Sequence, residues 1–244
     1  MKTVVWALVA AAFCLPAQAD NVLIVDGGST ALNPSLNADA ATTWSTVCNA
    51  QNQHTVTRAG ALPANLSAYQ QIWDIRGITT TPLTTSEMSA YAGALSSGTS
   101  VFLMGENSVN YLVRNNSLFQ FVDQVGGGQL TNDASNPGSY SAQTVYPPLN
   151  GNGLSTLGFQ ASGTATAAGL TGTMATVETA TGNSGSAFVW PVGTLANAPA
   201  GKLSMVLDVN FMMSYADPDN RLFLANLCGF MAAPSIQAVP AASP

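Results

Sequence analysis

The chain has 244 residues, of which 47% are hydrophobic and only 7% are charged, and its formal net charge is −6. Ordinary soluble domains carry roughly 25% charged residues, so hydroxyls, amides and glycines must solvate much of this surface. Six basic residues in the whole chain cannot neutralise a phosphate backbone, which excludes nucleic acid and anionic membrane as expected partners.

Residues 1–19 have the three parts of a secretory signal. Lys2 supplies the positive start, an apolar stretch follows from Val4 to Leu15, and Ala17-Gln18-Ala19 is a small-x-small cleavage site. The apolar stretch is shorter than the about 20 residues that span a bilayer. We therefore expect a mature protein that begins at Asp20, without a membrane anchor, and is secreted or periplasmic.

The first part of the mature chain alternates predicted strands and helices. NVLIVDGG (21–28) is a β-branched apolar run that ends in Asp26 and two glycines, which is typical of a central parallel strand. A helix is expected from about Asn37, where apolar residues take helical spacing. Further strands are expected over 54–60 and 69–77.

The next helix has the clearest signals in the chain. Thr84 and Glu87 form a capping box, and Gly98 stands where a left-handed residue ends a helix. Glu87 is therefore expected to be structural. A buried strand over 101–104 should follow, and then a helix over about 117–125.

The rest of the chain predicts an insertion and a return to the core. Residues 129–200 are rich in Gly, Thr, Ser, Asn and Ala and predict a β-rich insertion before the last core strand, 202–211. Asp217-Pro218 begins the last helix, and 234–244 is expected to be a disordered tail. Alternating strands and helices predict one α/β domain over 20–233, with a doubly wound, mostly parallel, flavodoxin-like sheet.

Two cysteines remain after cleavage of the signal, Cys48 and Cys228. An even count in an oxidising compartment favours a disulfide. In a doubly wound sheet the first and last helices lie side by side on one face, and these helices carry the two cysteines. We predict a disulfide between them, with two buried free thiols as the alternative.

Several segments resemble the class I glutamine amidotransferase-like superfamily. They are VLIVDGG, YQQIWDIRG, PLTTSEMSAYAGALSSG and SVFLMGEN, and VLDVNF with NRLFLANLCGF resemble the last strand and helix of secreted members that are not amidotransferases. The resemblance covers about 25–125 and 200–232 and lies at the level of the fold.

The resemblance also defines what is missing from this chain. Active members of the superfamily place a Cys at the turn after the strand that corresponds to 101–104, with a His and an acidic partner late in the chain. Here the turn carries Glu106 and Asn107, there is no Cys between 49 and 227, and the single histidine is His54. The Cys-His-Glu triad is therefore absent, and no amidotransferase activity is implied.

Polar residues gather where the predicted strands end. In open α/β sheets, ligands bind beyond the carboxyl ends of the strands. The residues expected there are Asp26, Asp74, Arg76, Glu106, Asn107, Asp208 and Asn210, with Arg114 just beyond them.

Three interpretations of these residues stay open. They bind a ligand or a Ca²⁺ or Mg²⁺ ion, which prefer oxygen ligands. Alternatively, Glu106 and Asp208 form the acid–base pair of a hydrolase, or Arg76 pairs with the carboxylates in a purely structural network. We expect a non-catalytic binding or surface-structural module that needs no cofactor other than such an ion. Its expected partners are an extracellular polymer or neighbouring surface proteins; the alternative is a hydrolase of an extracellular polymer such as a glycan.

Overall fold

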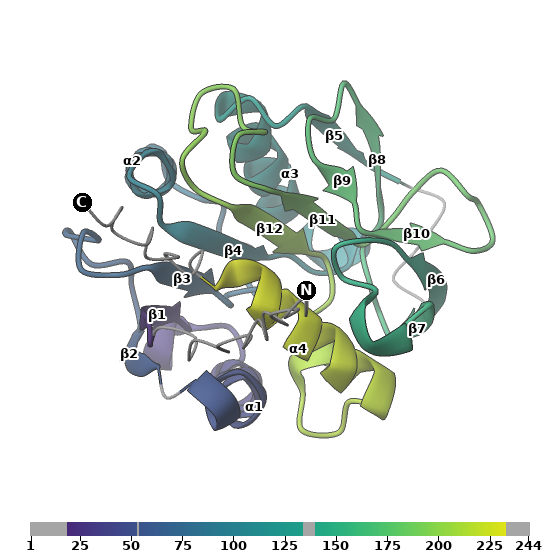
Figure 1. Cartoon of the computed structure of the whole chain (residues 1–244), viewed down its shortest axis with the longest axis horizontal. Helices are drawn as coiled ribbons and strands as arrows, with labels where there is room; N and C mark the ends of the chain where they lie inside the picture. The colour runs from purple at the N-terminus through teal and green to yellow at the C-terminus, as the bar shows by residue number, and fades with distance from the viewer. Residues whose placement is uncertain (1–18, 53, 134–139, 233–244) are drawn as a thin grey trace, which may run out of the picture.

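A seven-stranded sheet lies at the centre of the protein (Figure 1), in the order β2-β1-β3-β4-β12-β11-β9. The structure, a computed structural model, describes residues 19–52, 54–133 and 140–232. The first five strands in that order run parallel, and β11 runs antiparallel to both of its neighbours. These strands are β1 Asn21–Val25, β2 Thr55–Ala59, β3 Gln71–Asp74, β4 Ser100–Met104, β9 Thr173–Met174, β11 Ala187–Trp190 and β12 Leu203–Val206. The predicted doubly wound, mostly parallel sheet is confirmed.

Helices cover both faces of the sheet (Figure 1). The helices α1 (Pro34–Asn52) and α4 (Pro218–Met231) pack on one face, while α2 (Thr85–Ser96) and α3 (Ser108–Gln124) pack on the other. Successive strand residues point to opposite faces. In β1, Val22 and Ile24 therefore join the α1–α4 core, and Leu23 and Val25 join the α2–α3 core. Burial on both faces explains why β1 is continuously apolar.

The helix α3 begins at Ser108, well before the expected start at Ser117. Asn107 caps it, because its side-chain oxygen accepts a hydrogen bond from Asn110 N. The first turns invert the usual amphipathic pattern: Val109 is 63% exposed, whereas Arg114 is 1% exposed. A search for apolar residues at helical spacing misses such a segment, since its inward-facing side chains are polar.

The β-rich insertion is confirmed, and part of it belongs to the central sheet. Two of its strands, β9 and β11, extend that sheet beyond β12. The other strands form two small sheets, β10-β6-β7 and β5-β8. Their bounds are β5 Gln129–Asn132, β6 Ser141–Val145, β7 Thr156–Phe159, β8 Ala165–Ala168 and β10 Thr176–Glu178.

The predicted disulfide is present and joins the two helices of one face. Cys48 of α1 and Cys228 of α4 are bonded, and their Cα atoms lie 5.6 Å apart. Within the part of the chain that is described, no helix is long and apolar enough to cross a membrane. The predicted secretory signal (apart from Ala19) and the predicted tail 234–244 lie outside the described residues.

Candidate functional site

Two predicted site carboxylates lie at neighbouring strand ends. The strand β12 pairs with β4 in parallel, with Val206 opposite Met104, and continuing this register places Asp208 beside Glu106. Both side chains are buried: Glu106 is 3% exposed and Asp208 is fully covered. The sequence prediction that these residues share the carboxyl edge of the sheet, the edge where the parallel strands end, thus agrees with their positions.

Main-chain N–H groups of two segments bind the two carboxylate oxygens of Glu106. Its Oε2 accepts a hydrogen bond from Val209 N at 2.9 Å, and its Oε1 accepts one from Asn107 N at 3.0 Å. Asn115 of α3 binds the main chain of the turn after β4, because its Nδ2 donates a hydrogen bond to Glu106 O at 2.6 Å. Glu106 therefore ties the turn after β4 to the start of the loop after β12.

A segment of the insertion contacts both Asp208 and Glu106. Asp208 accepts hydrogen bonds from Asn210 N at 2.7 Å and from Gln160 N at 2.9 Å. Gly163 lies so close to the turn after β4 that a Cβ atom on it would be 2.6 Å from Glu106 O. Segment 160–163 thus contacts the carboxyl group of Asp208 and the main chain of Glu106, and only glycine fits at its closest point.

Burial also changes the protonation of the pair. Burial and, to a smaller extent, the nearby charge of Asp208 together raise the pKa of Glu106 to about 8, against the opposing effect of its hydrogen bonds. Burial likewise raises the pKa of Asp208, to about 6. Glu106 is accordingly the group of this pair that keeps its proton near neutral pH.

We expect the protein to lose stability as pH rises from 5 to 9. Because the folded state raises both pKa values, the pair stabilises the fold fully below about pH 4, and this contribution is lost as pH rises through 6 and 8. Because one pKa unit corresponds to about 1.4 kcal/mol, the loss should amount to several kcal/mol. Urea denaturation across this pH range measures it.

The matched test of this expectation is Glu106→Gln, which removes one titrating group while keeping the side-chain shape. Its stability should depend less on pH between 5 and 9 than that of the natural protein. Asp123→Asn, at an exposed position near the end of α3, is the control and should leave the profile unchanged. Parallel profiles for the natural protein and Glu106→Gln would show that Glu106 does not titrate in this range.

A second cluster surrounds Asp74 at the end of β3. Asp74 is fully buried and receives Arg76 through two hydrogen bonds, Nε at 2.9 Å and Nη2 at 2.7 Å. Arg114 Nη2 and Tyr91 Oη each donate to it at 2.9 Å. Burial alone would raise the pKa of Asp74, but the charges of Arg76 and Arg114 outweigh it and hold the pKa well below its usual value.

The cluster around Asp74 also includes Glu87, for which the sequence predicted only the helix-capping role. Glu87 closes the capping box of α2 as predicted, and its Oε1 also lies 2.8 Å from Arg76 Nη1. Arg76 is thereby bound to two carboxylates, Asp74 and Glu87. Its pairing with Asp74 is the arrangement that the structural interpretation expected, whereas Glu106 and Asp208 are held by the main chain instead.

A third pair lies at the end of β1. Asp26 Oδ2 is 2.7 Å from Arg58 Nη2, and Gly28 N donates to Asp26 Oδ1 at 2.9 Å. Sequence reasoning missed Arg58. The strand register offers the signal for it, because Arg58 of β2 lies opposite Ile24 of β1, two residues before Asp26.

A cavity of about 160 Å³ lies beside these residues, at the ends of β1, β2 and β3. The chain passes from β1 to β2 on one side, whereas β3 lies on the other side of β1. This is the topological switch point, where doubly wound sheets bind ligands. We call it the switch-point cavity; its lining residues are Gly27, Ala31, Asn37, Gly60, Arg76, Ile78, Thr79 and Thr81. Arg76 is the predicted site residue among them, and Asn37 was not predicted.

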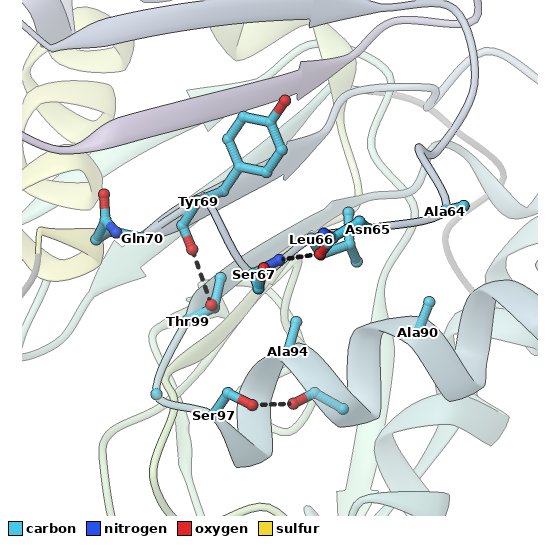
Figure 2. A pocket seen from close by; sticks show the side chains of 12 residues that line it. Ala64, Asn65, Leu66, Ser67, Tyr69, Gln70, Ala90, Ala94, Ser97 and Thr99 are labelled. Atoms are coloured by element: carbon cyan, nitrogen blue, oxygen red, sulfur yellow. Dashed lines mark hydrogen bonds between the residues drawn. The ribbon is translucent and has the colours of Figure 1, made fainter.

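A larger groove, of about 440 Å³, lies at the opposite, amino edge of the sheet (Figure 2). The loop around Asn65–Ser67 forms one wall, and Ala90 and Ala94 of α2 point toward it from the other. His54 also lies at this edge, just before β2, where its Nδ1 accepts a hydrogen bond from Asp20 N at 3.1 Å. The single histidine is therefore far along the strands from Glu106.

Metal-binding chemistry was one interpretation of the strand-end residues. Within residues 19–52, 54–133 and 140–232, no group of three or more His, Cys, Asp or Glu is placed to hold a metal ion. The predicted site residues instead lie in three places. Glu106 and Asn107 lie near Asp208 and Asn210, and Asp74 pairs with Arg76. Asp26 pairs with Arg58, which was not predicted.

No protein-family model matches the sequence, and no curated protein matches it. Solved structures do share its fold. The mmIFT52 N-terminal domain superposes with a TM-score of 0.66 at 8% identity, covering 88% of this chain and 99% of that one. A ThuA-like protein from Bacteroides uniformis gives a TM-score of 0.55 at 15% identity, with 91% and 93% covered.

Two further solved structures, both of them from enzyme-related proteins by their names, share the fold. A GMP synthase protein from Thermoplasma acidophilum gives a TM-score of 0.51 at 9% identity, covering 87% of this chain and 94% of that one. An exo-β-1,4-mannosidase from an Opitutaceae bacterium gives 0.54 at 11% identity; the match covers 88% of this chain but 36% of the enzyme. These likenesses agree with the predicted amidotransferase-like fold and, at such identities, concern the fold alone.

Proposed function

We propose that this protein is a secreted, non-catalytic binding module whose ligand lies at the carboxyl edge of the sheet, in the switch-point cavity. The observation that carries the proposal is the contrast between two places on that edge. Glu106 and Asp208 are buried, with segment 160–163 against the main chain of Glu106 and the carboxyl group of Asp208, whereas a cavity of about 160 Å³ remains at the ends of β1, β2 and β3. The second of these places therefore offers space for a ligand.

The chemistry of the turn after β4 supports a role without catalysis. By the resemblance of the sequence, Glu106 stands where amidotransferases carry their nucleophile. Both of its carboxylate oxygens accept hydrogen bonds from main-chain N–H groups. A nucleophile would need a neighbouring base, and His54 lies at the amino edge. The disulfide and the signal pattern of residues 1–19 support export to an oxidising compartment.

The test is a binding screen by thermal unfolding of residues 20–244. The panel contains oligosaccharides, monosaccharides, amino acids, nucleotides, and Ca²⁺ or Mg²⁺ with EDTA as the reference. A ligand present at 100 times its dissociation constant stabilises by about 2.7 kcal/mol, which gives a visible shift. We expect a shift that Ala31→Leu, which fills the switch-point cavity, removes.

The matched control for that variant is Ala90→Leu, the same change in the amino-edge groove. It should leave the shift intact. A shift lost in Ala90→Leu but kept in Ala31→Leu would move the ligand to the amino edge and overturn the proposal. The absence of any shift across the panel would also contradict it.

A hydrolase of an extracellular glycan is the second candidate. It is favoured by the two adjacent carboxyl groups, one of them with a pKa of about 8 as a general acid requires, and by the similarity of the fold to part of a mannosidase. Release of reducing ends from polysaccharides, lost in both Glu106→Gln and Asp208→Asn, would establish it. Segment 160–163 would have to move for a substrate to reach either carboxyl group.

A further inference from the structure

We infer that the switch-point cavity takes a small uncharged ligand rich in hydroxyl groups, about the size of one sugar ring. This inference rests on the proposed function, because it specifies the ligand for the same cavity. It is carried by an unpartnered acceptor in the cavity wall, by the balance of charge around the cavity, and by the space that glycines leave there.

Asn37 supplies the unpartnered acceptor. It lies in the first turn of α1, lines the cavity and is 1% exposed. Its Nδ2 donates to Asp26 O at 2.7 Å, which fixes the orientation of the amide. Its Oδ1 has no hydrogen-bond partner among the described residues. A buried acceptor without a partner is unfavourable, and a hydroxyl or amide donor of a ligand would satisfy it.

The charges around the cavity cancel. Arg76 is the charged residue in its lining, and its guanidinium is bound to Asp74 and Glu87. Arg114 balances the second of these negative charges through Asp74. An ionic ligand would therefore lose its hydration without gaining a free counter-charge, which is unfavourable. An uncharged polar ligand does not carry this cost.

Glycines keep the cavity open on the β1 side. Gly27 and Gly28 have φ values of +81° and +51°, in the left-handed region that favours glycine. A Cβ atom on Gly27 would come within 2.9 Å of Ala31 Cβ and 3.6 Å of Asn37 Nδ2. A side chain at position 27 would therefore crowd Ala31 and Asn37 on this side of the cavity.

The remaining wall suits hydroxyl groups. Thr79 and Thr81 lie on the side of the cavity that follows β3. A bound water needs roughly 10–15 Å³ of such space, so 160 Å³ accommodates on the order of ten non-hydrogen atoms. The amino-edge groove is larger, but among the described residues that line it none carries a buried polar side-chain atom without a partner.

The experiment is an NMR titration of residues 20–244 with matched rings of different charge. The neutral probes are the methyl glycosides of glucose, mannose and fucose and myo-inositol; the charged probes are glucuronate, glucosamine and inositol phosphate. We expect a neutral probe to bind at least tenfold more tightly than its charged counterpart. The side-chain amide signal of Asn37 should shift with it, because Oδ1 gains a donor.

Two variants make the test specific. Ala31→Leu should abolish binding, and Asn37→Ala should weaken it at least tenfold; if Asn37→Ala does not fold, the amide signal of the natural protein decides. Tighter binding of a charged probe in this cavity would overturn the ligand class and leave the proposed function standing. Neutral binding that leaves the Asn37 signal unmoved and survives Ala31→Leu would overturn the inference, and failure of every probe and of the broader panel would overturn both.

Discussion

Replacing Cys48 and Cys228 together by alanine is expected to lower the free energy of unfolding by about 5 kcal/mol. The two residues are 180 positions apart in the sequence, so the bond removes a large part of the loop-closure entropy of the unfolded chain. It also joins α1 to α4 across one face of the sheet. Urea denaturation of residues 20–244 at neutral pH measures the change.

Reduction of the natural protein separates the bond from the packing of its side chains. Cys48 is 3% and Cys228 is 9% exposed, so alanine also removes buried sulfur atoms. The reduced natural protein should lose most of the same approximately 5 kcal/mol. A reduced protein as stable as the oxidised one would contradict the entropic account and assign the effect of the variant to packing.

Asp74→Asn is expected to destabilise the protein by about 3–5 kcal/mol. Removing one partner of a buried ion pair leaves the opposite charge uncompensated, and Asp74 is fully buried between Arg76 and Arg114. Because the folded state lowers the pKa of Asp74, its contribution is present above about pH 4 and is lost as pH falls below that value. Denaturation at pH 7 and pH 3 checks both expectations.

The matched control is Asp26→Asn, the same chemical change in a more exposed pair. Arg58 has 44% of its side chain exposed, and such pairs contribute about 0–1 kcal/mol. The variant should therefore remain within about 1 kcal/mol of the natural protein. Equal losses for Asp74→Asn and Asp26→Asn would contradict the distinction between a fully buried network and a pair with one exposed partner.

The main elements of the fold follow from local patterns in the sequence. The apolar run of β1, the capping box Thr84–Glu87 and the Asp217-Pro218 start of α4 each act over a few residues, and each is present where expected. The disulfide followed from topology, because the two cysteines lie on helices that a doubly wound sheet brings together.

The parts that could not be predicted depend on contacts between distant segments. The early start of α3 is hidden because Arg114 and Asn115, which are polar, face the interior. Asp208 accepts a hydrogen bond from Gln160, 48 positions away. Gly163, which contacts the main chain of Glu106, lies in a loop with no regular sequence pattern. Asn37 looked like an ordinary helix residue, since only the folded chain shows its unpartnered oxygen beside a cavity.

The two outer strands of the central sheet bear on aggregation. Unpaired strand edges are the usual templates for association between copies of a protein. The edge strand β2 carries two threonines and Arg58, and β9 at the other edge has only two residues. Short and polar edges offer little backbone to a second molecule, so the outer strands themselves limit edge-to-edge association.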